Sequence, residues 1–298
     1  MKSIFITGSS GFVGKNLIKY FNSEYKFYRF SKNQEINLKQ DVVLHLAGKA
    51  HDLKNTLNIE EYYIVNTELT KHVFDNFLKS EAKVFITLSS VKAVSDISDC
   101  ALTEDYLPNP KTHYGKSKLL AEQYILSKNI PKNKRVYILR PCMIHGPGNK
   151  GNLNLLYKIV SNGFFWPSGA YENKRSLCSI DNLCFIINEL IQNHNIPSGI
   201  YNLADDESIS TKQILKIISR IINRNFLFLN IPKFFINLIS YFGDFFKLPI
   251  NKENLKKLTT NYIVSNEKII KAINKKLPVT TEEGLKKTIH FFIQNNYQ

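Results

Sequence analysis

Short apolar segments alternate with longer amphipathic segments over the first 141 residues, and this alternation limits the fold more than any other feature. The longer segments have the apolar spacing of helices of roughly 12 to 20 residues. Strands joined by helices of that length form a parallel sheet through right-handed crossovers, with helices on both faces. We therefore predict an α/β fold with a doubly wound parallel sheet, whose strands include SIFITG, KFYRF, DVVLHLA, KVFITLS and RVYILRP.

The first strand-like segment leads into a glycine-rich turn and then a helix, in the sequence FITGSSGFVGKNL. Gly8, Gly11 and Gly14 have the spacing G-x-x-G-x-x-G. Glycine allows the tight turn and lets the main chain approach a pyrophosphate, which would lie at the positive end of the helix. The turn alone is a weak match, but its position at the start of the doubly wound region favours a ligand site.

A second candidate site lies in HYGKSKLLAEQ, residues 113–123, which has the apolar spacing of a helix. Tyr114 and Lys118 are four residues apart and therefore share one face of that helix. A lysine ammonium at this spacing can stabilise a tyrosine phenolate, so Tyr114 is a candidate general acid or base. An ordinary helix surface gives the same short pattern, and the rest of the chain has to decide between the two interpretations.

The net charge of +15 in 298 residues, from 40 basic and 25 acidic side chains, could indicate a polyanionic partner. The lysines are scattered among many Asn and Ile residues and do not alternate with stacking aromatics, so we expect no nucleic-acid binding. The four cysteines lack the spacing of a metal site. We interpret them as reduced thiols in a cytoplasmic protein without a bound metal: Cys100, Cys142, Cys178 and Cys184.

Neither the N-terminal segment nor the most apolar later stretch predicts a membrane protein. The N-terminus passes directly into KSIFITG, so we expect no signal peptide. The most apolar later stretch, 226–250, is interrupted by Pro232, Lys233, Asp244 and Pro249, and is too broken to span a bilayer. An amphipathic helix from about 233 to 247 could lie on a membrane surface, although packing against the protein is favoured.

The alternation loosens after Arg140, where glycine and proline become frequent. SLCSI, a helix near 181–193 and GIYNLA indicate a strand and helix that return to the sheet, and the chain is mostly helical from about 205. We predict a sheet domain at 1–150 that also takes in the returning segment near 181–204. The segments 151–180 and 205–298 would form a smaller, mostly helical substrate-binding domain.

The ordered series TGSSGFVG, LHLAG, SSVKAV, YGKSK, LRPCMIHGPG, NKRSLCSIDNL and EEGLKKT resembles the extended short-chain dehydrogenase/reductase superfamily. It is most similar to the branch of nucleotide-sugar epimerases, dehydratases and 4-ketoreductases, in particular those of bacterial surface-polysaccharide synthesis. The resemblance implies a Rossmann fold, a bound nicotinamide cofactor and hydride transfer at a sugar carbon. Tyr114 would then be the catalytic acid or base, Lys118 would lower its pKa and hold the nicotinamide ribose, and Ser90 would hydrogen-bond the reacting oxygen.

The resemblance also implies which residues bind the cofactor: Gly8, Gly11, Phe12, Val13, Gly14, Arg29, Ser31, Lys32, Asn37, Leu46, Ala47, Gly48, Asn66, Tyr114 and Lys118. NAD-preferring relatives end the second strand with a carboxylate that binds the adenosine ribose. Here KFYRFSKN offers Arg29 and Lys32 instead, so we expect NADP(H), with NAD as the alternative. Asn37 takes the place of the usual adenine-contacting Asp.

The residues after Ser90 separate the reactions of this branch. The 4,6-dehydratases have Asp and Glu there, whereas this chain has Val91 and Lys92, so we do not expect dehydration. A 4-ketoreductase would reduce a UDP-4-keto-6-deoxy-N-acetylhexosamine with exchangeable NADPH, and a UDP-sugar 4-epimerase would retain NAD. The missing carboxylate favours the reductase slightly. Lys92 is either structural or a substrate contact.

A UDP-sugar substrate would be bound by residues that the same resemblance assigns: His51, Ser90, Asn152 and Arg175. The planar fork of Arg175 suits paired phosphate oxygens. Many relatives have a substrate-contacting Asn where this chain has Met143, and we expect Trp166 to pack rather than to stack on uracil. Remoter alternatives are a reductase of a substrate other than a sugar nucleotide and a non-catalytic binding protein on the same fold.

By analogy with the family, helices around 62–79 and 113–127 would form a four-helix interface. We therefore expect a homodimer.

Overall fold

A computed structural model describes residues 1–31, 36–50, 59–149, 151–163, 166, 173–229, 231–232, 234 and 259–295, apart from the side chains of Asp99 and Asn152. Six parallel strands form the central sheet in the order β2-β1-β3-β4-β6-β9. Their bounds are β1 Ser3–Thr7, β2 Lys26–Arg29, β3 Val42–His45, β4 Val84–Leu88, β6 Arg135–Pro141 and β9 Gly199–Leu203. The predicted doubly wound α/β fold is confirmed. The strand order reverses at β1, because β2 lies on one side of β1 and β3 and the later strands lie on the other.

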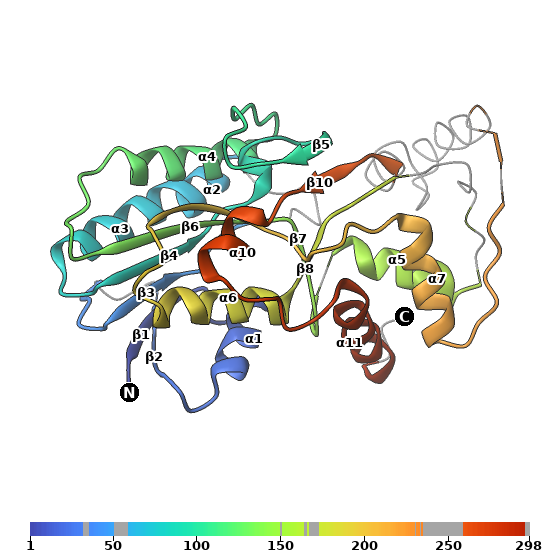
Figure 1. Cartoon of the computed structure of the whole chain (residues 1–298), viewed down its shortest axis with the longest axis horizontal. Coiled ribbons are helices and arrows are strands. Elements are labelled where there is room, and N and C mark those ends of the chain that lie inside the picture. Colours follow the sequence, from blue (N-terminus) through green and yellow to red (C-terminus); the bar gives the residue numbers. More distant parts are fainter. Residues whose placement is uncertain are drawn as a thin grey trace.

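Helices cover both faces of this sheet (Figure 1). Helices α1 (Phe12–Phe21) and α6 (Ile180–Gln192) pack against each other on one face. Helices α3 (Leu69–Lys79) and α4 (His113–Leu126) pack together on the other. The short helix α2 (Glu60–Tyr63) and a π-helical segment, η1 (Ile64–Glu68), lead into α3.

The strand residues alternate between two apolar clusters, because successive side chains of a strand point to opposite faces. Ile4, Ile6 and Leu44 belong to the cluster under α1 and α6. Phe5 and Val43 belong to the cluster under α3 and α4. Burial on both faces explains why the strands are continuous apolar runs in the sequence.

A second, smaller body lies at the carboxyl side of the sheet. Helices α5 (Asn152–Ser161), α7 (Thr211–Ile221) and α11 (Thr281–Gln294) share a separate apolar cluster around Leu156, Leu215 and Leu285. The N-terminus lies by β1 and the C-terminus beside α11, at opposite sides of the view (Figure 1).

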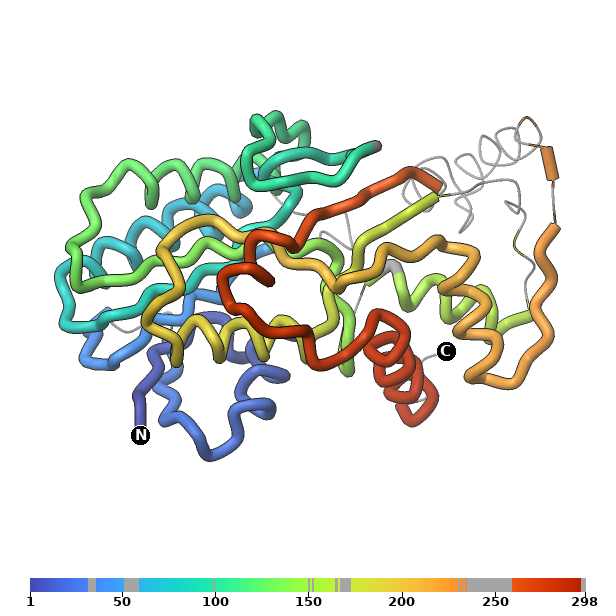
Figure 2. Tube along the Cα trace, in the orientation of Figure 1, coloured from blue at the N-terminus to red at the C-terminus, as the bar shows by residue number. Residues whose placement is uncertain are grey.

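Two small parallel sheets connect segments far apart in the sequence. The segment SLCSI was predicted as a strand returning to the main sheet, but it pairs in one of these small sheets instead. The other three strands were not predicted. One pairs β5 (Ser98–Leu102) with β10 (Tyr262–Val264), and the other pairs β7 (Met143–His145) with β8 (Leu177–Ser179). Figure 2 shows how the chain returns along β10 to helix α10 (Glu267–Ile273) beside the main sheet and then turns back to α11. Strands this short have too few residues for a period-two pattern to identify them.

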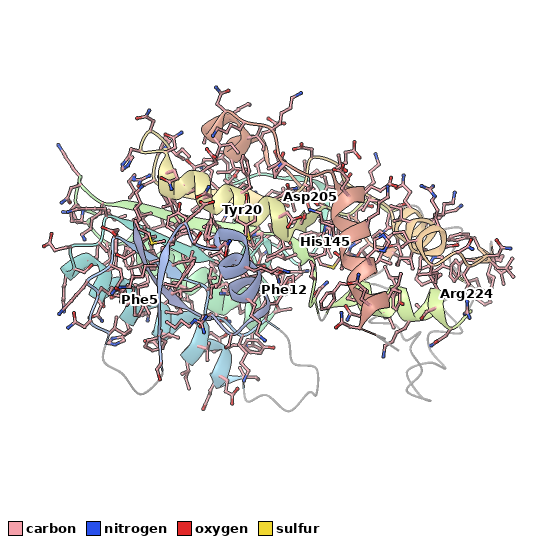
Figure 3. All side chains as sticks on the ribbon, turned by 90° about the horizontal axis from the view of Figure 1, so that it is seen from below. Phe5, Phe12, Tyr20, His145, Asp205 and Arg224 are labelled. Carbon is pink, nitrogen blue, oxygen red and sulfur yellow. The ribbon has the colours of Figure 1, made fainter. Side chains whose placement is uncertain are left out.

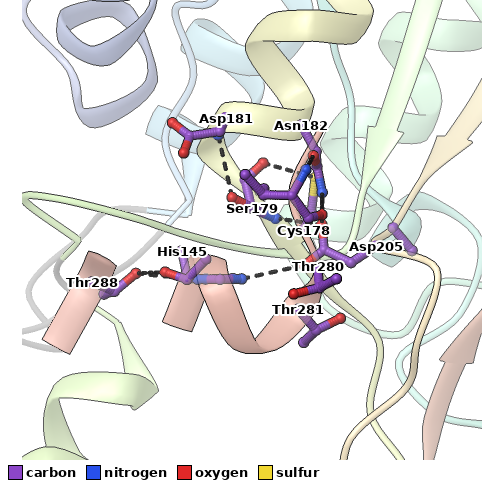
Figure 4. Close-up of polar contacts among 12 residues, drawn as sticks. His145, Cys178, Ser179, Asp181, Asn182, Asp205, Thr280, Thr281 and Thr288 are labelled. Carbon is purple, nitrogen blue, oxygen red and sulfur yellow. Dashed lines mark hydrogen bonds and ion pairs between the residues drawn. The ribbon is translucent and has the colours of Figure 1, made fainter. Parts of the chain in front are cut away.

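The two bodies are joined by a buried polar cluster around His145 and Asp205, which lie between α6 and α11 in Figure 3. The imidazole of His145 pairs with the Thr288 hydroxyl at 3.2 Å and with the Asp205 carboxylate at 3.4 Å (Figure 4). The other oxygen of Asp205 accepts hydrogen bonds from the Ser179 main chain at 2.8 Å and the Asn182 amide at 2.7 Å. Side chains from β7, α6 and α11 therefore meet in one network.

The two-domain division predicted from the sequence stays a prediction, and the apolar clusters suggest where one boundary should move. Tyr262, Val264, Ile269 and Ile273 pack into the cluster of the main sheet rather than that of α5, α7 and α11. We propose that the sheet domain includes residues 262–273. The helix predicted near 233–247 lies almost entirely outside the described residues, and within the described ranges no helix is long and apolar enough to cross a membrane.

Helix α3 ends on a buried lysine from a distant part of the sequence. The ammonium of Lys134 donates to the carbonyls of Phe77, Ser80 and Ala82 at 3.1, 2.6 and 2.7 Å, and lies 4.5 Å from the centre of the Phe77 ring. The last carbonyls of a helix have no partner within it and carry the negative end of its dipole. Lys134 thus satisfies the end of α3 and fixes it beside β4.

We predict that Lys134→Met lowers the free energy of unfolding by about 2 kcal/mol, because charge-assisted hydrogen bonds to buried carbonyls are lost. Chemical denaturation monitored by circular dichroism measures the change. The exposed Lys132 gives the matched control, since Lys132→Met removes the same charge from the surface of the same loop. Equal stability of the two variants would contradict the capping role.

Candidate functional site

The glycine turn between β1 and α1 has no room for a side chain at Gly8 or Gly14. Gly8 has a φ of +70°, and a Cβ at this residue would lie 2.7 Å from the main chain of Leu46 and Ala47. A Cβ at Gly14 would overlap the carbonyl oxygen of Gly8. Gly11 begins α1 without a side-chain cap, so the N–H groups of the first turn are available to an anion. This turn fits the pyrophosphate of a dinucleotide at the point where the strand order reverses.

The loop after β3 forms the next wall. The N–H groups of Leu46 and Ala47 donate to the main-chain and side-chain oxygens of Thr7 at 3.2 and 3.1 Å. A Cβ at Gly48 would lie 2.9 Å from the ammonium of Lys118. The structure thus brings the predicted residues Leu46, Ala47 and Gly48 between the glycine turn and Lys118.

Asn66 lies in the π-helical segment η1 and is fully buried. Its amide accepts from the N–H of Lys49 at 2.8 Å and donates to the carbonyl of the same residue at 3.0 Å. The second N–H of the amide donates to the Ser117 hydroxyl at 3.0 Å. Asn66 therefore ties the loop after β3 to helix α4 one residue before Lys118. Its direct contact with a cofactor stays a prediction.

The three predicted catalytic residues lie at the junction of β4 and α4. Ser90 caps the single turn η2 (Val91–Ala93) and accepts from the Lys92 N–H at 3.2 Å. Helix α4 begins at His113. The hydroxyl of Thr112 caps it by accepting a hydrogen bond from the N–H of Gly115 at 3.2 Å. A Cβ at Gly115 would overlap the carbonyl oxygen of Lys92, so η2 and the start of α4 are in direct contact. This contact brings Ser90 to Tyr114, whose hydroxyl it hydrogen-bonds.

Burial dominates the electrostatics of this junction. It raises the pKa of Tyr114, and the hydrogen bond from Ser90 lowers that pKa only in part. Tyr114 is therefore a phenol at neutral pH in the protein without ligand, and the expected lowering of its pKa by Lys118 is not found. Burial also lowers the pKa of Lys118 to about 8, opposed by the nearby charge of Glu122.

The buried His45, at the end of β3, completes the charge pattern and was not identified from the sequence. Thr70 donates to the carbonyl of Asn66, so its oxygen accepts from His45 Nε2 at 2.9 Å. Nδ1 of His45 then accepts from the Thr7 hydroxyl at 2.8 Å. Burial, followed by the charge of Lys118, lowers the pKa of His45 to about 3. His45 is neutral, which leaves Lys118 as the cation at this point of the site.

The end of β2 carries the residues predicted to select the cofactor. Arg29 closes the strand and is exposed, as are Ser31 and Asn37. No carboxylate occurs from Lys26 to Ser31 along β2 and its end. Lys32 lies outside the described residues, and so does His51.

Arg175 is held between the two bodies. It exchanges main-chain hydrogen bonds of 2.9 and 2.8 Å with Ile209. Its guanidinium is close enough to Cys142 and Tyr262 to interact with them, and burial lowers its pKa. Asn152 starts helix α5, but its side chain lies outside the described residues. A direct test of either residue as a substrate contact therefore falls to experiment.

Tyr262, which the sequence analysis missed, connects Arg175 to the catalytic turn. Its main chain bonds to those of Lys174 and Ser176, each at 2.8 Å, on either side of Arg175. Its hydroxyl donates to the Ser95 carbonyl at 2.6 Å, and the ammonium of Lys92 lies 4.7 Å from its ring centre. Lys92 also donates to the carbonyl of Asp96 at 2.6 Å, which shows a structural role for this residue.

No group of three or more side chains suited to a metal ion occurs among the described residues. The cysteines are all unpaired within the same ranges, and Cys142, Cys178 and Cys184 are buried. The described residues of the site present a phenol, a hydroxyl and an ammonium beside the glycine turn.

Comparisons with known proteins agree with this arrangement. The profile of the NAD dependent epimerase/dehydratase family matches residues 29–204. The chain is similar to the UDP-glucose 4-epimerase of Vibrio cholerae, with 30% identity over 323 residues that cover 99% of this chain and 97% of that protein.

Two solved structures share the fold. RMD from Pseudomonas aeruginosa, complexed with NADPH, has a TM-score of 0.74 at 17% identity and covers 99% of this chain and 100% of its own. WbmG from Bordetella bronchiseptica, in complex with NAD, has a TM-score of 0.76 at 16% identity and covers 100% of this chain and 96% of its own. Since the profile matches more than half of the chain and the Vibrio likeness spans nearly all of it, this protein is an enzyme of the NAD dependent epimerase/dehydratase family, within the extended short-chain dehydrogenase/reductase superfamily predicted from the sequence.

Proposed function

We propose that the protein reduces C4 of a UDP-4-keto-6-deoxy-N-acetylhexosamine with NADPH. The observation that carries the choice of a reductase is the end of β2, where Arg29 is exposed and no carboxylate occurs from Lys26 to Ser31. A ketone that accepts a hydride at carbon needs a proton at oxygen, and a buried phenol is a proton donor. An epimerase would use the same tyrosine in both directions, as a base while C4 is oxidised and as an acid while it is reduced, so Tyr114 itself is compatible with either reaction.

The residues of the junction have separate parts in this reduction. Bound NADPH supplies the hydride to C4. Tyr114 donates the proton from its hydroxyl to O4, and Ser90 orients that oxygen by a hydrogen bond. Lys118 stabilises the phenolate that forms on Tyr114 as the proton leaves. Arg175 supports the proposed substrate class, because its guanidinium suits a diphosphate.

The alternative, a UDP-sugar 4-epimerase with retained NAD, is favoured by the likeness to the Vibrio cholerae enzyme over nearly the whole chain. One assay distinguishes the two. Mixing the purified protein with NADPH and UDP-4-keto-6-deoxy-N-acetylhexosamine should lower the absorbance of NADPH in proportion to the substrate added. An unchanged absorbance, together with interconversion of UDP-N-acetylglucosamine and its C4 epimer, would favour the epimerase.

We predict that Tyr114→Phe abolishes turnover, with a loss of at least about a thousandfold in kcat, because the proton donor is removed. The ring is kept, so the Kd for NADPH, measured by fluorescence titration, should stay within about twofold. Tyr137→Phe is the matched control, since Tyr137 is buried in the sheet away from Ser90. Turnover by Tyr114→Phe near that of the control would show that another group supplies the proton.

The preference for NADPH is proposed from Arg29 at the end of β2, where no carboxylate is present. We predict that Arg29→Ala raises the KM for NADPH by about tenfold or more and leaves the KM for NADH nearly unchanged, since a charge-assisted contact to the 2′-phosphate is lost. Lys26→Ala removes one charge from the other end of β2 and serves as control. Equal changes for both cofactors would contradict this assignment.

We also propose a homodimer that buries the outer side of η1 and α4, which pack against each other. Ile64, Leu120 and Leu126 are apolar and are 58%, 44% and 56% exposed there. Contact between two copies would cover these side chains.

Leu120→Glu should convert the dimer to a monomer, because an unpaired carboxylate would be buried at the interface. Light scattering after size-exclusion chromatography measures the mass. Leu227→Glu changes an apolar residue that is 69% exposed in a different part of the chain, and should leave the mass unchanged. A dimeric Leu120→Glu protein, or a monomeric parent, would refute this interface.

A further inference from the structure

A buried cluster of charged side chains lies one helical turn after Lys118, and the proposed mechanism does not use it. Glu122 on α4 and Arg140 on β6 are each 2% exposed. Nε of Arg140 donates to the two oxygens of the Glu122 carboxylate at 3.0 and 3.2 Å, and Nη2 donates to Oε2 at 2.5 Å. The Ser89 hydroxyl donates to Oε1 of the same carboxylate. Burying charges is costly unless they are paired and hydrogen-bonded, as these are.

The cluster and Lys118 hold the same short segment. Lys118 donates to the carbonyl of Leu88 at 2.8 Å, and Glu122 accepts from the side chain of the next residue, Ser89. Ser90 follows directly. The end of β4 that carries the catalytic serine is therefore fastened to α4 at two points, one helical turn apart.

Within the described part of the chain, few charged or titratable groups surround Lys118. Helix α4 contributes Tyr114 and Glu122, and β3 contributes the neutral His45. Strand β4 contributes only the Leu88 carbonyl, and Arg140 of β6 lies behind Glu122 as its partner. The charge that favours the ammonium form of Lys118 is that of Glu122, whereas burial disfavours it and lowers the pKa of Lys118 to about 8.

We propose that Glu122 is a positioning residue that keeps Lys118 in its charged form beneath Tyr114, with Arg140 and Ser89 fixing the carboxylate. The effect of Glu122 on catalysis rests on the proposed function, in which the ammonium stabilises the phenolate. The effect of Glu122 on the charge of Lys118 is independent of the proposed function. Arg140 and Ser89 hold the Glu122 carboxylate in place by hydrogen bonds. That carboxylate is the opposite charge that acts on Lys118, in an interior where solvent screens it little.

The first test measures the charge of Lys118 without turnover. In protein containing lysine labelled with ¹³C at Cε, the Lys118 resonance is identified by its absence in Lys118→Arg, and its shift is followed with pH. The midpoint in the parent should be about 8. Glu122→Gln should lower it by about one pH unit, because an opposite charge close to the ammonium is lost. Glu81→Gln removes an equal charge from the exposed loop between α3 and β4 and should not move it.

The second test follows kcat/KM with NADPH against pH. In the parent, kcat/KM should fall as pH rises through the midpoint of Lys118, because the neutral amine no longer stabilises the phenolate. In Glu122→Gln this fall should occur about one pH unit lower. A purely structural role for Glu122 would instead reduce kcat/KM by the same factor at every pH.

Two further variants keep the proposal open to refutation. Ser89→Ala leaves both charges in place and should not move the midpoint. If Glu122→Gln does not fold because Arg140 is left unpaired, Glu122→Gln with Arg140→Met removes both charges and should still lower the midpoint, by less than one pH unit because a neighbouring cation is lost as well.

An unchanged Lys118 midpoint in a folded variant without Glu122 would overturn the proposal. A lowered midpoint in a protein that turns over none of the proposed substrates would instead support it and refute the proposed reaction.

Discussion

The ammonium of Lys118 donates a hydrogen bond to the main-chain carbonyl of Leu88 in an interior where little water can replace that bond. Strand β4, the end of β3, the loop that follows it and helix α4 all make contacts or carry charges that suit this buried cation. Position 48 has no space for a side chain because the ammonium lies against it, and His45 remains neutral next to it. The carboxylate one turn further along α4 supplies the opposite charge.

This constraint explains why the cofactor loop and the catalytic residues form one unit. Asn66 binds both main-chain groups of Lys49 and also the Ser117 hydroxyl, so the loop after β3 and helix α4 cannot shift independently. The hydrogen bonds to Asn66 arise in a π-helical segment, a form that is rare except at functional positions. A ligand in the glycine turn would therefore lie at a fixed distance from Tyr114 and Ser90.

Much of the fold and part of the site were predictable from the sequence. Short continuous apolar runs, helical spacing and glycine spacing are local patterns, so the strands of the main sheet, the glycine turn and the shared face of Tyr114 and Lys118 could be identified. The missed features depend on contacts between distant residues. Glu122 and Arg140 look like ordinary charged positions until the fold buries them together, and Tyr262 occurs in a strand of only three residues. The direction of the Tyr114 pKa was misjudged because burial, which no local pattern reveals, outweighs its polar neighbours.

Strand β10 has a consequence for the synthesis of this protein. Its Tyr262 contacts the turn that follows Ser90 and the segment that carries Arg175, and the Lys92 ammonium covers its ring. A ribosome releases these three segments in sequence, and β10 emerges long after the main sheet can fold. The nascent chain could thus hold a complete glycine turn while the substrate side is still unassembled. A chain that ended before residue 262 would leave part of the main apolar core uncovered and would not hold Arg175 to the turn after Ser90.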